Sequence, residues 1–174
     1  MKAFYKIPVI LFFLIVSGFT NVQNKDNTNA KIKATFIYNF TRYIEWPAEA
    51  KKGNFEIGVV GRTPLYLELL KMQERTTRGA QPFQIKKYLS VSSIGSCHMI
   101  FVAKDKSAEI DAVVKKFKGK STLIISEKPG LIEKGDINFV IENSKQGFEI
   151  NKGNIAGHSL SIASSLQAFA TKVI

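Results

Sequence analysis

The stretch FEIGVVGRTPLYLELLKMQ, residues 55–73, contains the pattern that decides the fold. Its opening run FEIGVV has the length and β-branching of a short buried strand, and Gly61 ends that run. Thr63 and Pro64 follow as a good N-cap and a good first helical residue, and they predict a helix through LYLELLKMQ. The stretch therefore predicts a strand, a tight turn and a helix, the unit from which α/β domains are built.

This alternation of strands and helices continues along the chain. Residues 83–89 alternate enough to predict a strand, and the apolar runs at 98–103 and 122–126 predict two buried strands. Between the last two, Asp105 is expected to cap a helix that ends at Gly119.

The last third of the chain departs from the strand–helix alternation. Residues 137–142 and 147–151 are two strand candidates separated by the turn-forming sequence NSKQ, which predicts a hairpin. A final helix is predicted from an apolar stripe formed by Ile162, Leu166, Phe169, Ala170 and Val173. Together these elements predict an α/β fold: a single three-layer domain with a mixed β-sheet flanked by helices.

The N-terminus has the order of a secretory signal peptide. Residues 1–22 pass from a short basic start into an apolar stretch and then into small and polar residues, with cleavage expected near Thr20. The continuous apolar run is too short for a spanning helix, which needs roughly 20 residues. Residues 23–30 are polar and Asn-rich and predict a disordered leader. We therefore expect an α/β domain over residues 31–174, exported to the periplasm.

The first helix of that domain is predicted from residue 30 to Trp46. Apolar residues recur every three to four positions, and Pro47 disfavours helical geometry at the residue before it. The sequence NFTRYIEWP, residues 39–47, is therefore mainly architectural: Trp46 covers the end of the core, while Arg42 and Glu45 remain on the flank.

Composition and charge narrow the function classes. The formal net charge is +11, but the lysines are scattered and few aromatic residues are interleaved with them, so solvated faces or an acidic partner are favoured over nucleic acid. The single cysteine, Cys97, precedes an apolar strand and predicts a buried packing role rather than a nucleophile. His98 and His158 lack the spacing of metal ligands, so neither a metal nor another cofactor is expected.

Two places carry residues of chemical interest. Glu149 lies in a partly buried strand and needs a positive or donor partner, such as Arg42; a structural ion pair or a hydrogen bond to the backbone is favoured over general acid or base catalysis. The turn GVVGRTPL, residues 58–65, resembles a phosphate-binding strand-to-helix junction in outline but lacks the glycine patterns of known phosphate loops, so a capped helix is the better interpretation.

Several blocks together carry a resemblance to a known family. They are KATFIYNFTRYIEWP, FEIGVVG, CHMIFVAK, LIISEKPGLIEKGDINFVIE and FEINKGNIAGHSLSIASSLQAFA. Over residues 31–174 the chain resembles the YfiR family of small periplasmic regulators (YfiR/HmsC-like). The most specific pieces are the FTRYIEWP block, the cysteine before the buried strand, and FEIN with the small-residue segment after it.

The resemblance implies a regulator that is not an enzyme. Such a protein binds the periplasmic part of an inner-membrane signalling protein, typically a diguanylate cyclase, and represses it, which controls cyclic di-GMP output and biofilm formation. A histidine kinase is an alternative partner, and a homodimer is an open alternative. The resemblance and the chemistry of the side chains together give these candidate binding residues: Arg42, Glu45, Trp46, Glu149 and His158.

The chain departs from the family pattern at two places. Cys97 stands alone where some members use cysteine pairs, and Lys134-Gly135-Asp136 replaces a glycine pair before the hairpin.

Two alternative functions remain open at this point. One is a periplasmic protein that binds a small anionic metabolite between the Arg62–Thr63 helix start and the segment near His158. A remoter one is a hydrolase that uses Ser159 or Ser161 with His158.

Overall fold

The computed structural model describes residues 17–174. Residues 1–16, most of the predicted signal peptide, lie outside the described residues. None of the helices in the described part is long and apolar enough to cross a membrane.

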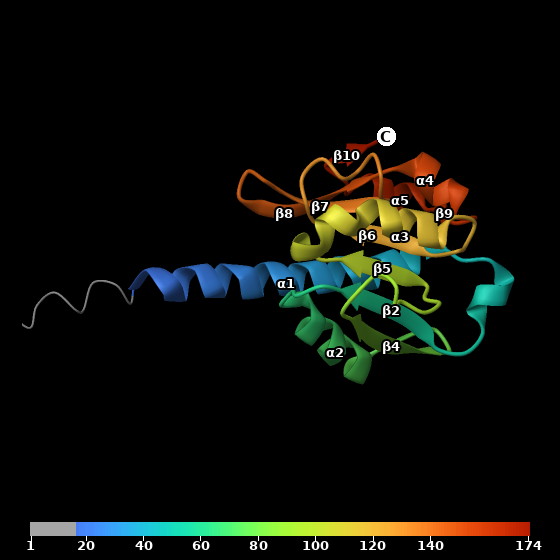
Figure 1. The fold of residues 1–174 in the computed structure, drawn as a ribbon, viewed down its shortest axis with the longest axis horizontal. Coiled ribbons are helices and arrows are strands. Elements are labelled where there is room, and N and C mark those ends of the chain that lie inside the picture. Colours follow the sequence, from blue (N-terminus) through green and yellow to red (C-terminus); the bar gives the residue numbers. More distant parts are fainter. Residues whose placement is uncertain (1–16) are drawn as a thin grey trace, which may run out of the picture.

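An eight-stranded mixed sheet forms the centre of the molecule (Figure 1), with the strand order β10-β8-β7-β6-β5-β2-β4-β3. The five strands β4, β2, β5, β6 and β7 run parallel to one another, and β8 is antiparallel to β7. Short strands complete both edges, β3 antiparallel to β4 and β10 parallel to β8. The strands are β2 (Phe55–Val60), β3 (Thr77–Arg78), β4 (Gln81–Tyr88), β5 (Met99–Val102), β6 (Leu123–Ser126), β7 (Ile137–Glu142), β8 (Lys145–Ile150) and β10 (Lys172–Val173).

Helices cover both faces of this sheet. The long helix α1 (Ser17–Tyr43) packs beside α2 (Leu65–Arg75) on one face, and α3 (Ile110–Phe117), which follows the 3-10 helix η3 (Lys104–Glu109), covers the other. The middle strands are buried on both faces because they lie between these helices, which explains their unbroken apolar runs. The predicted three-layer α/β domain with a mixed sheet is thus confirmed.

The remaining elements are short. The 3-10 helix η2 (Ala48–Lys51) links α1 to β2, and two helices, α4 (Lys152–Gly157) and α5 (Ser164–Gln167), lie in the C-terminal segment. A separate two-stranded sheet joins β1 (Ile44–Glu45) to β9 (Ser161–Ile162) in antiparallel pairing.

The turn between β2 and α2 requires glycine. Gly61 has φ +99°, and a Cβ atom there would collide with the side chains of Asp105 and Ala103. Asp105, predicted to cap its own helix, instead accepts hydrogen bonds from the backbone N–H of Arg62 at 3.0 Å and from its Nε at 3.4 Å. These bonds hold the pKa of the Asp105 carboxyl below its usual value.

The predicted hairpin is confirmed as β7 and β8. Its turn residues Asn143 and Ser144 have φ of 48° and 63°, the pair of positive values that a two-residue turn of type I′ requires.

Helix α1 differs from the predicted first helix at both ends. The leader predicted as disordered, residues 23–30, is instead helical, and its described side chains Lys25, Thr28 and Asn29 line a cavity with the tip of the hairpin. At the other end the helix stops at Tyr43, because Ile44 and Glu45 pair as a strand with β9.

The predicted final helix is wrong. Ile162 lies in β9 opposite Ile44, and Val173 lies in β10 opposite Ile150, so only the four residues of α5 between them are helical. Backbone pairing to two different partners overrides the helical spacing of the apolar residues.

Candidate functional site

The strand order places a natural binding position at the carboxyl ends of β2 and β5. From β2 the chain crosses to β4 on one side, whereas β5 continues to β6 and β7 on the other, so the connections diverge between these two strands. Ligands of doubly wound α/β proteins bind outside the sheet at such a point. A cavity of about 450 Å³ lies there, which we name the carboxyl-edge cavity; its charged lining residues are Asp26, Lys33, Arg62, Lys104 and Glu127.

An ion pair closes one wall of the carboxyl-edge cavity. The Nζ of Lys33, on α1, lies 2.6 Å from Oε2 of Glu127, and the two side chains are only 16% and 11% exposed. The other carboxylate oxygen of Glu127 accepts the backbone N–H of Lys104 at 2.9 Å. The other charged residues of the lining are Arg62, Lys104 and Asp26. Arg62 is paired with Asp105 at 3.4 Å. Cations and carboxylates are therefore balanced around the cavity, and Lys104 is the cation on its wall best placed to meet an anionic group.

The alternative ligand site predicted from the sequence is wrong in its location. Arg62 and Thr63 do line the carboxyl-edge cavity, but His158 does not. The imidazole Nδ1 of His158 lies 2.9 Å from the carbonyl oxygen of Lys120, just before β6 and thus near the opposite end of the parallel strands.

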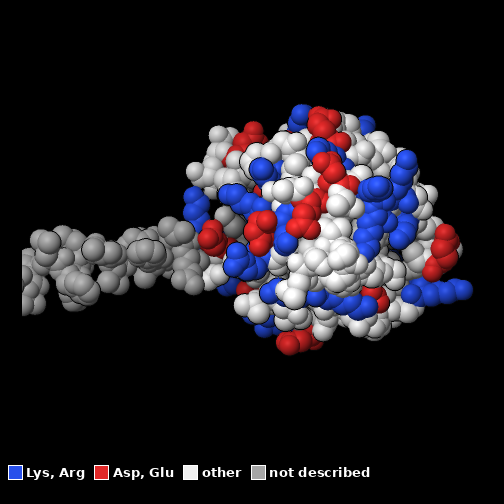
Figure 2. All heavy atoms as spheres, in the orientation of Figure 1, with Lys and Arg blue, Asp and Glu red and all other residues white. Residues whose placement is uncertain are grey.

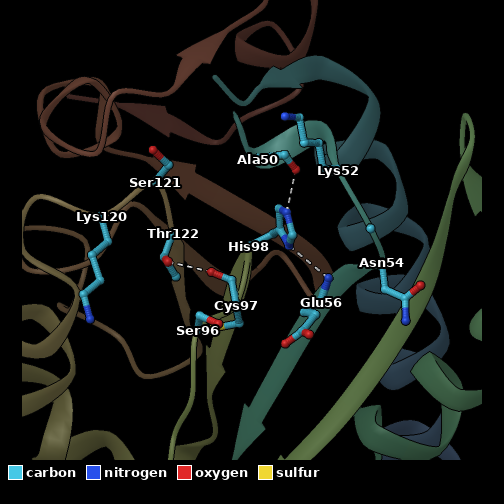
Figure 3. A pocket seen from close by; sticks show the side chains of 11 residues that line it. Ala50, Lys52, Asn54, Glu56, Ser96, Cys97, His98, Lys120, Ser121 and Thr122 are labelled. Atoms are coloured by element: carbon cyan, nitrogen blue, oxygen red, sulfur yellow. Dashed lines mark hydrogen bonds between the residues drawn. The ribbon is translucent and has the colours of Figure 1, made fainter. Parts of the chain in front are cut away.

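A second cavity, of about 420 Å³, lies at the amino ends of β2, β5 and β6 (Figure 3). Within it the backbone N–H of Glu56 donates to Nδ1 of His98, so the ring N–H is on Nε2 and donates to the carbonyl oxygen of Ala50 at 2.8 Å. Burial lowers the pKa of His98. Both ring nitrogens are engaged in joining the β2–β5 edge to η2, which gives His98 a structural role.

Cys97 lines the same cavity but is itself buried. Burial raises the pKa of its thiol to about 12, so the sulfur is protonated at neutral pH and is a poor nucleophile. This agrees with the packing role predicted for it.

Three of the candidate binding residues lie together at the end of α1. Arg42 is exposed, with its guanidinium 5.9 Å from the centre of the Tyr38 ring, and Glu45 is exposed and pairs with Lys51 at 3.0 Å. Trp46 is buried at 2% exposure: its ring contacts Phe55 edge to face, and its Nε1–H donates to the carbonyl oxygen of His98 at 3.3 Å. The structure thus gives Trp46 the core-covering position expected of it and leaves Arg42 and Glu45 on the flank.

Glu149 has a different partner from the one predicted. Its Oε2 accepts a hydrogen bond at 3.0 Å from Nδ2 of Asn138, the residue opposite it on β7, whereas Arg42 lies over Tyr38. The Oδ1 of Asn138 in turn accepts from the hydroxyl of Ser126 at 2.8 Å. This three-residue chain crosses β6, β7 and β8, and we refer to it as the Glu149 chain.

Sequence reasoning singled out Glu149 but missed Ser126 and Asn138, because each of these two lies in a run interpreted as an apolar strand. Ser126 and Asn138 are fully buried polar residues, and a polar residue at an otherwise apolar strand position is the one signal that could have pointed to them.

His158 lies buried at the end of α4. Its Nδ1 faces the Lys120 carbonyl oxygen, and its Nε2 lies 3.8 Å from Oδ1 of Asp136, a carboxylate with no exposed surface. The hydrolase hypothesis needs this imidazole to activate Ser159 or Ser161, but both ring nitrogens face other groups.

These features define the class of protein: a doubly wound α/β domain with a charged cavity at the point where its connections diverge, and with buried polar networks rather than a catalytic constellation at its candidate residues. The chain matches the YfiR/HmsC-like family model over residues 30–171, and it belongs to that family. Proteins of this family are periplasmic regulators of cyclic di-GMP signalling and act through partner signalling proteins. A comparison with curated proteins gives no match.

Proposed function

We propose that this protein represses an inner-membrane signalling protein, typically a diguanylate cyclase, by binding its periplasmic part. Membership of the YfiR/HmsC-like family over residues 30–171 carries the proposal. Repression would lower cyclic di-GMP output and biofilm formation, and the protein itself would catalyse no reaction. Export would use a signal peptide in residues 1–22, and N-terminal sequencing of the mature protein tests that step.

The proposed contact surface is centred on the end of α1. Arg42 lines a surface hollow there, and Glu45 and Lys51 form an exposed ion pair nearby in sequence. Arg78 lines the same hollow, but its guanidinium already donates to the carbonyl oxygen of Thr41 at 2.8 Å. The exposed guanidinium of Arg42 favours a carboxylate of the partner, because arginine binds carboxylates with paired hydrogen bonds. The net charge of +11, which falls to +9 once Lys2 and Lys6 leave with the signal peptide, also favours an acidic partner.

The remaining candidate residues support or extend this surface. Glu149 is half-buried on β8 and offers a carboxylate to the partner. Trp46 and His158 are buried, so their proposed contribution is to hold the surface in position. Figure 2 shows basic and acidic side chains interspersed over much of one face. Variants that test the contact surface are therefore chosen by where the charged residue lies and not by its effect on the net charge.

A crosslinking pull-down from native membranes tests the proposal. The tagged exported protein should recover one inner-membrane cyclase or kinase that has a periplasmic domain. Arg42→Glu should reduce that recovery by about tenfold, since reversing a charge at an interface costs roughly 1.4 kcal/mol or more. Lys115→Glu, which reverses an equally exposed charge on α3, is the matched control and should leave recovery unchanged.

Recovery of general envelope proteins alone would argue against repression by contact. Recovery of a second copy of the chain would identify a homodimer. The molecular mass of the purified protein in solution would show whether that homodimer is stable without a partner.

A second candidate function is binding of a small anionic metabolite in the carboxyl-edge cavity. The observation that favours it is the cavity at the divergence point with Arg62 and Lys104 on its wall. Thermal unfolding with a panel of phosphate and carboxylate compounds tests it without any partner. Stabilisation by one compound, lost in Lys104→Met but kept in Lys115→Met, would support ligand binding, and no stabilisation across the panel would refute it.

A further inference from the structure

Two buried ionisable groups face each other where the C-terminal segment meets the sheet. Asp136 directly precedes β7, and His158 directly follows α4. Their facing atoms, Oδ1 of Asp136 and Nε2 of His158, are 3.8 Å apart, and the side chains are 1% and 10% exposed. Burying two ionisable side chains in the core is costly unless their charges are compensated, so the protonation state of this pair has to be accounted for.

The hydrogen bonds around the pair fix where protons can be. The carbonyl oxygen of Lys120 can only accept, so the Nδ1 of His158 that faces it at 2.9 Å carries a hydrogen. On the other side, Oδ2 of Asp136 accepts the backbone N–H of Ile124 at 2.6 Å. Oδ1 has no hydrogen-bond partner among the described residues. The one vacant position for a proton therefore lies between Oδ1 and Nε2.

Without a proton there, the contact is repulsive. The neutral imidazole would present the lone pair of Nε2 to a carboxylate oxygen, and both would be acceptors without a donor. At 3.8 Å the two atoms lie beyond hydrogen-bond distance. With one proton, on the carboxyl or on the imidazole, the contact becomes attractive and the two groups can approach to a hydrogen bond. The contact between Asp136 and His158 therefore holds the end of α4 to the start of β7 at low pH and pushes them apart at high pH.

We propose that Asp136 and His158 share one proton and act as a pH-sensitive latch that holds the C-terminal segment to the sheet. Acidification closes the latch, and a rise in pH opens it. Closing the latch takes one proton from solvent and opening it releases that proton, and no bond between heavy atoms forms or breaks. That the latch regulates partner binding rests on the proposed function, whereas the latch itself does not.

The segment that the latch holds reaches the proposed contact surface. After His158 the chain forms β9, which pairs with β1 directly after α1, and then β10, which pairs with β8 beside Glu149. The backbone N–H of Asn151, two residues after Glu149, also donates to the carbonyl oxygen of Asp136 at 2.8 Å. Opening the latch would thus loosen both neighbours of the surface at once.

The charged groups of the neighbouring elements do not replace either partner. Lys134, on the loop before Asp136, pairs with Asp111 of α3, and the ammonium of Lys120 lies over the ring of Phe117. Glu133 is exposed, and the carboxylate of Glu149 accepts from Asn138. Burial raises the pKa of Asp136 to about 6, while the neighbouring His158 acts in the opposite direction.

A pH titration of the purified protein by NMR tests the latch without a partner. The chain has two histidines, so His158→Gln assigns the imidazole signals. We expect the Asp136 carboxyl to titrate near pH 6, and the ring signals of His158 and the Ile124 amide to shift in the same step. Amide protection of Leu160 and Leu166 should fall about tenfold or more as the proton is lost, after correction for intrinsic exchange.

The variants separate the latch from general destabilisation. Asp136→Asn keeps the bond to Ile124 and offers a permanent N–H to His158, so the shared step and the loss of protection should disappear; Asp111→Asn should leave both unchanged. If Asp136→Asn does not fold, His158→Gln serves instead, and it should move the Asp136 step upward. An Asp136 carboxyl that titrates near its usual value of 3.8, or a shared step that persists in Asp136→Asn, would overturn the proposal. Failure to capture a partner would leave these results unaffected and would count only against the proposed function.

Discussion

The ion pair between Lys33 and Glu127 offers the sharpest test of how α1 is held to the sheet. It joins residues 94 positions apart in sequence, from α1 to the end of β6. Glu127→Gln keeps an oxygen for the backbone N–H of Lys104. Lys33→Met keeps an unbranched side chain but removes the ammonium that lies 5.7 Å from the centre of the Phe139 ring. Each substitution therefore removes the charge, and the Lys33 variant also removes this contact with Phe139.

The expected magnitude follows from burial. Exposed ion pairs contribute about 0–1 kcal/mol, whereas removing one partner of a buried pair costs roughly 3–5 kcal/mol. At 16% and 11% exposure the side chains of Lys33 and Glu127 lie closer to the buried limit. We expect each single variant to lose about 2 kcal/mol of unfolding free energy, a fall of roughly 4–8 °C in melting temperature for a chain of this size. The pairwise coupling energy should be about 1–2 kcal/mol.

Urea unfolding followed by fluorescence measures these values in a double-mutant cycle. The only tryptophan, Trp46, is buried and will report loss of the core. The matched control is the exposed pair Lys134 and Asp111, at 47% and 71% exposure, which should couple by less than about 0.5 kcal/mol. A Lys33–Glu127 coupling no larger than that of the control pair would refute the reasoning from burial.

Three further predictions concern the turn, the core and pH. Gly61→Ala should destabilise the protein by about 1–3 kcal/mol in urea unfolding, because alanine is strained at φ +99° and its Cβ collides with Asp105; an unchanged midpoint would show that the turn relaxes freely. Phe40→Ala should cost about 3–5 kcal/mol by the same assay, since the ring is fully buried 5.0 Å from that of Phe148; a loss below about 1 kcal/mol would mean that the cluster repacks. The pKa of Asp136 is raised on folding from 3.8 to about 6, so the folded state holds an extra proton between these values and stability falls as pH rises through them. The wild type should therefore lose about 2 kcal/mol relative to Asp136→Asn between pH 4 and pH 6, and parallel pH profiles for the two proteins would contradict this.

The sequence predicts the layers of this fold well because its central strands are buried on both faces. FEIGVV, HMIFVA and TLIIS are apolar runs too short for helices, and they are β2, β5 and β6 in the structure. Gly61 and the hairpin turn at Asn143 and Ser144 have local causes that a sequence shows directly.

The errors arise where distant partners decide local structure. The spacing of Ile162 and Val173 is helical, yet each pairs with a different strand, and neither partner is visible from the spacing. The spacing of apolar residues in the first helix predicts a buried stripe of Ile32, Phe36, Phe40, Tyr43 and Ile44. Of these, Phe40 and Ile44 are indeed fully buried. Ile32 and Tyr43, however, are each 37% exposed, and Ile37, outside that stripe, is fully buried.

The site was harder to predict than the fold because its key contacts are long-range. Glu149 was correctly singled out as a strand carboxylate that needs a partner, but the partner is Asn138 across the hairpin. In the sequence, Asp136 stands out only as a departure from the family pattern. Its contact with His158 is formed by the folding of distant segments and cannot be seen in the sequence. Polar residues at buried strand positions are the signal to follow in related chains.

The most direct measurement of the central claim is the cellular cyclic di-GMP level with and without this protein. The account predicts that the level rises when the protein is absent from the periplasm. Restoring the wild-type protein should return it to its original value, and restoring Lys115→Glu should do the same, whereas Arg42→Glu should not. A level that stays constant when the protein is removed, while its proposed membrane partner is present, would contradict repression by contact.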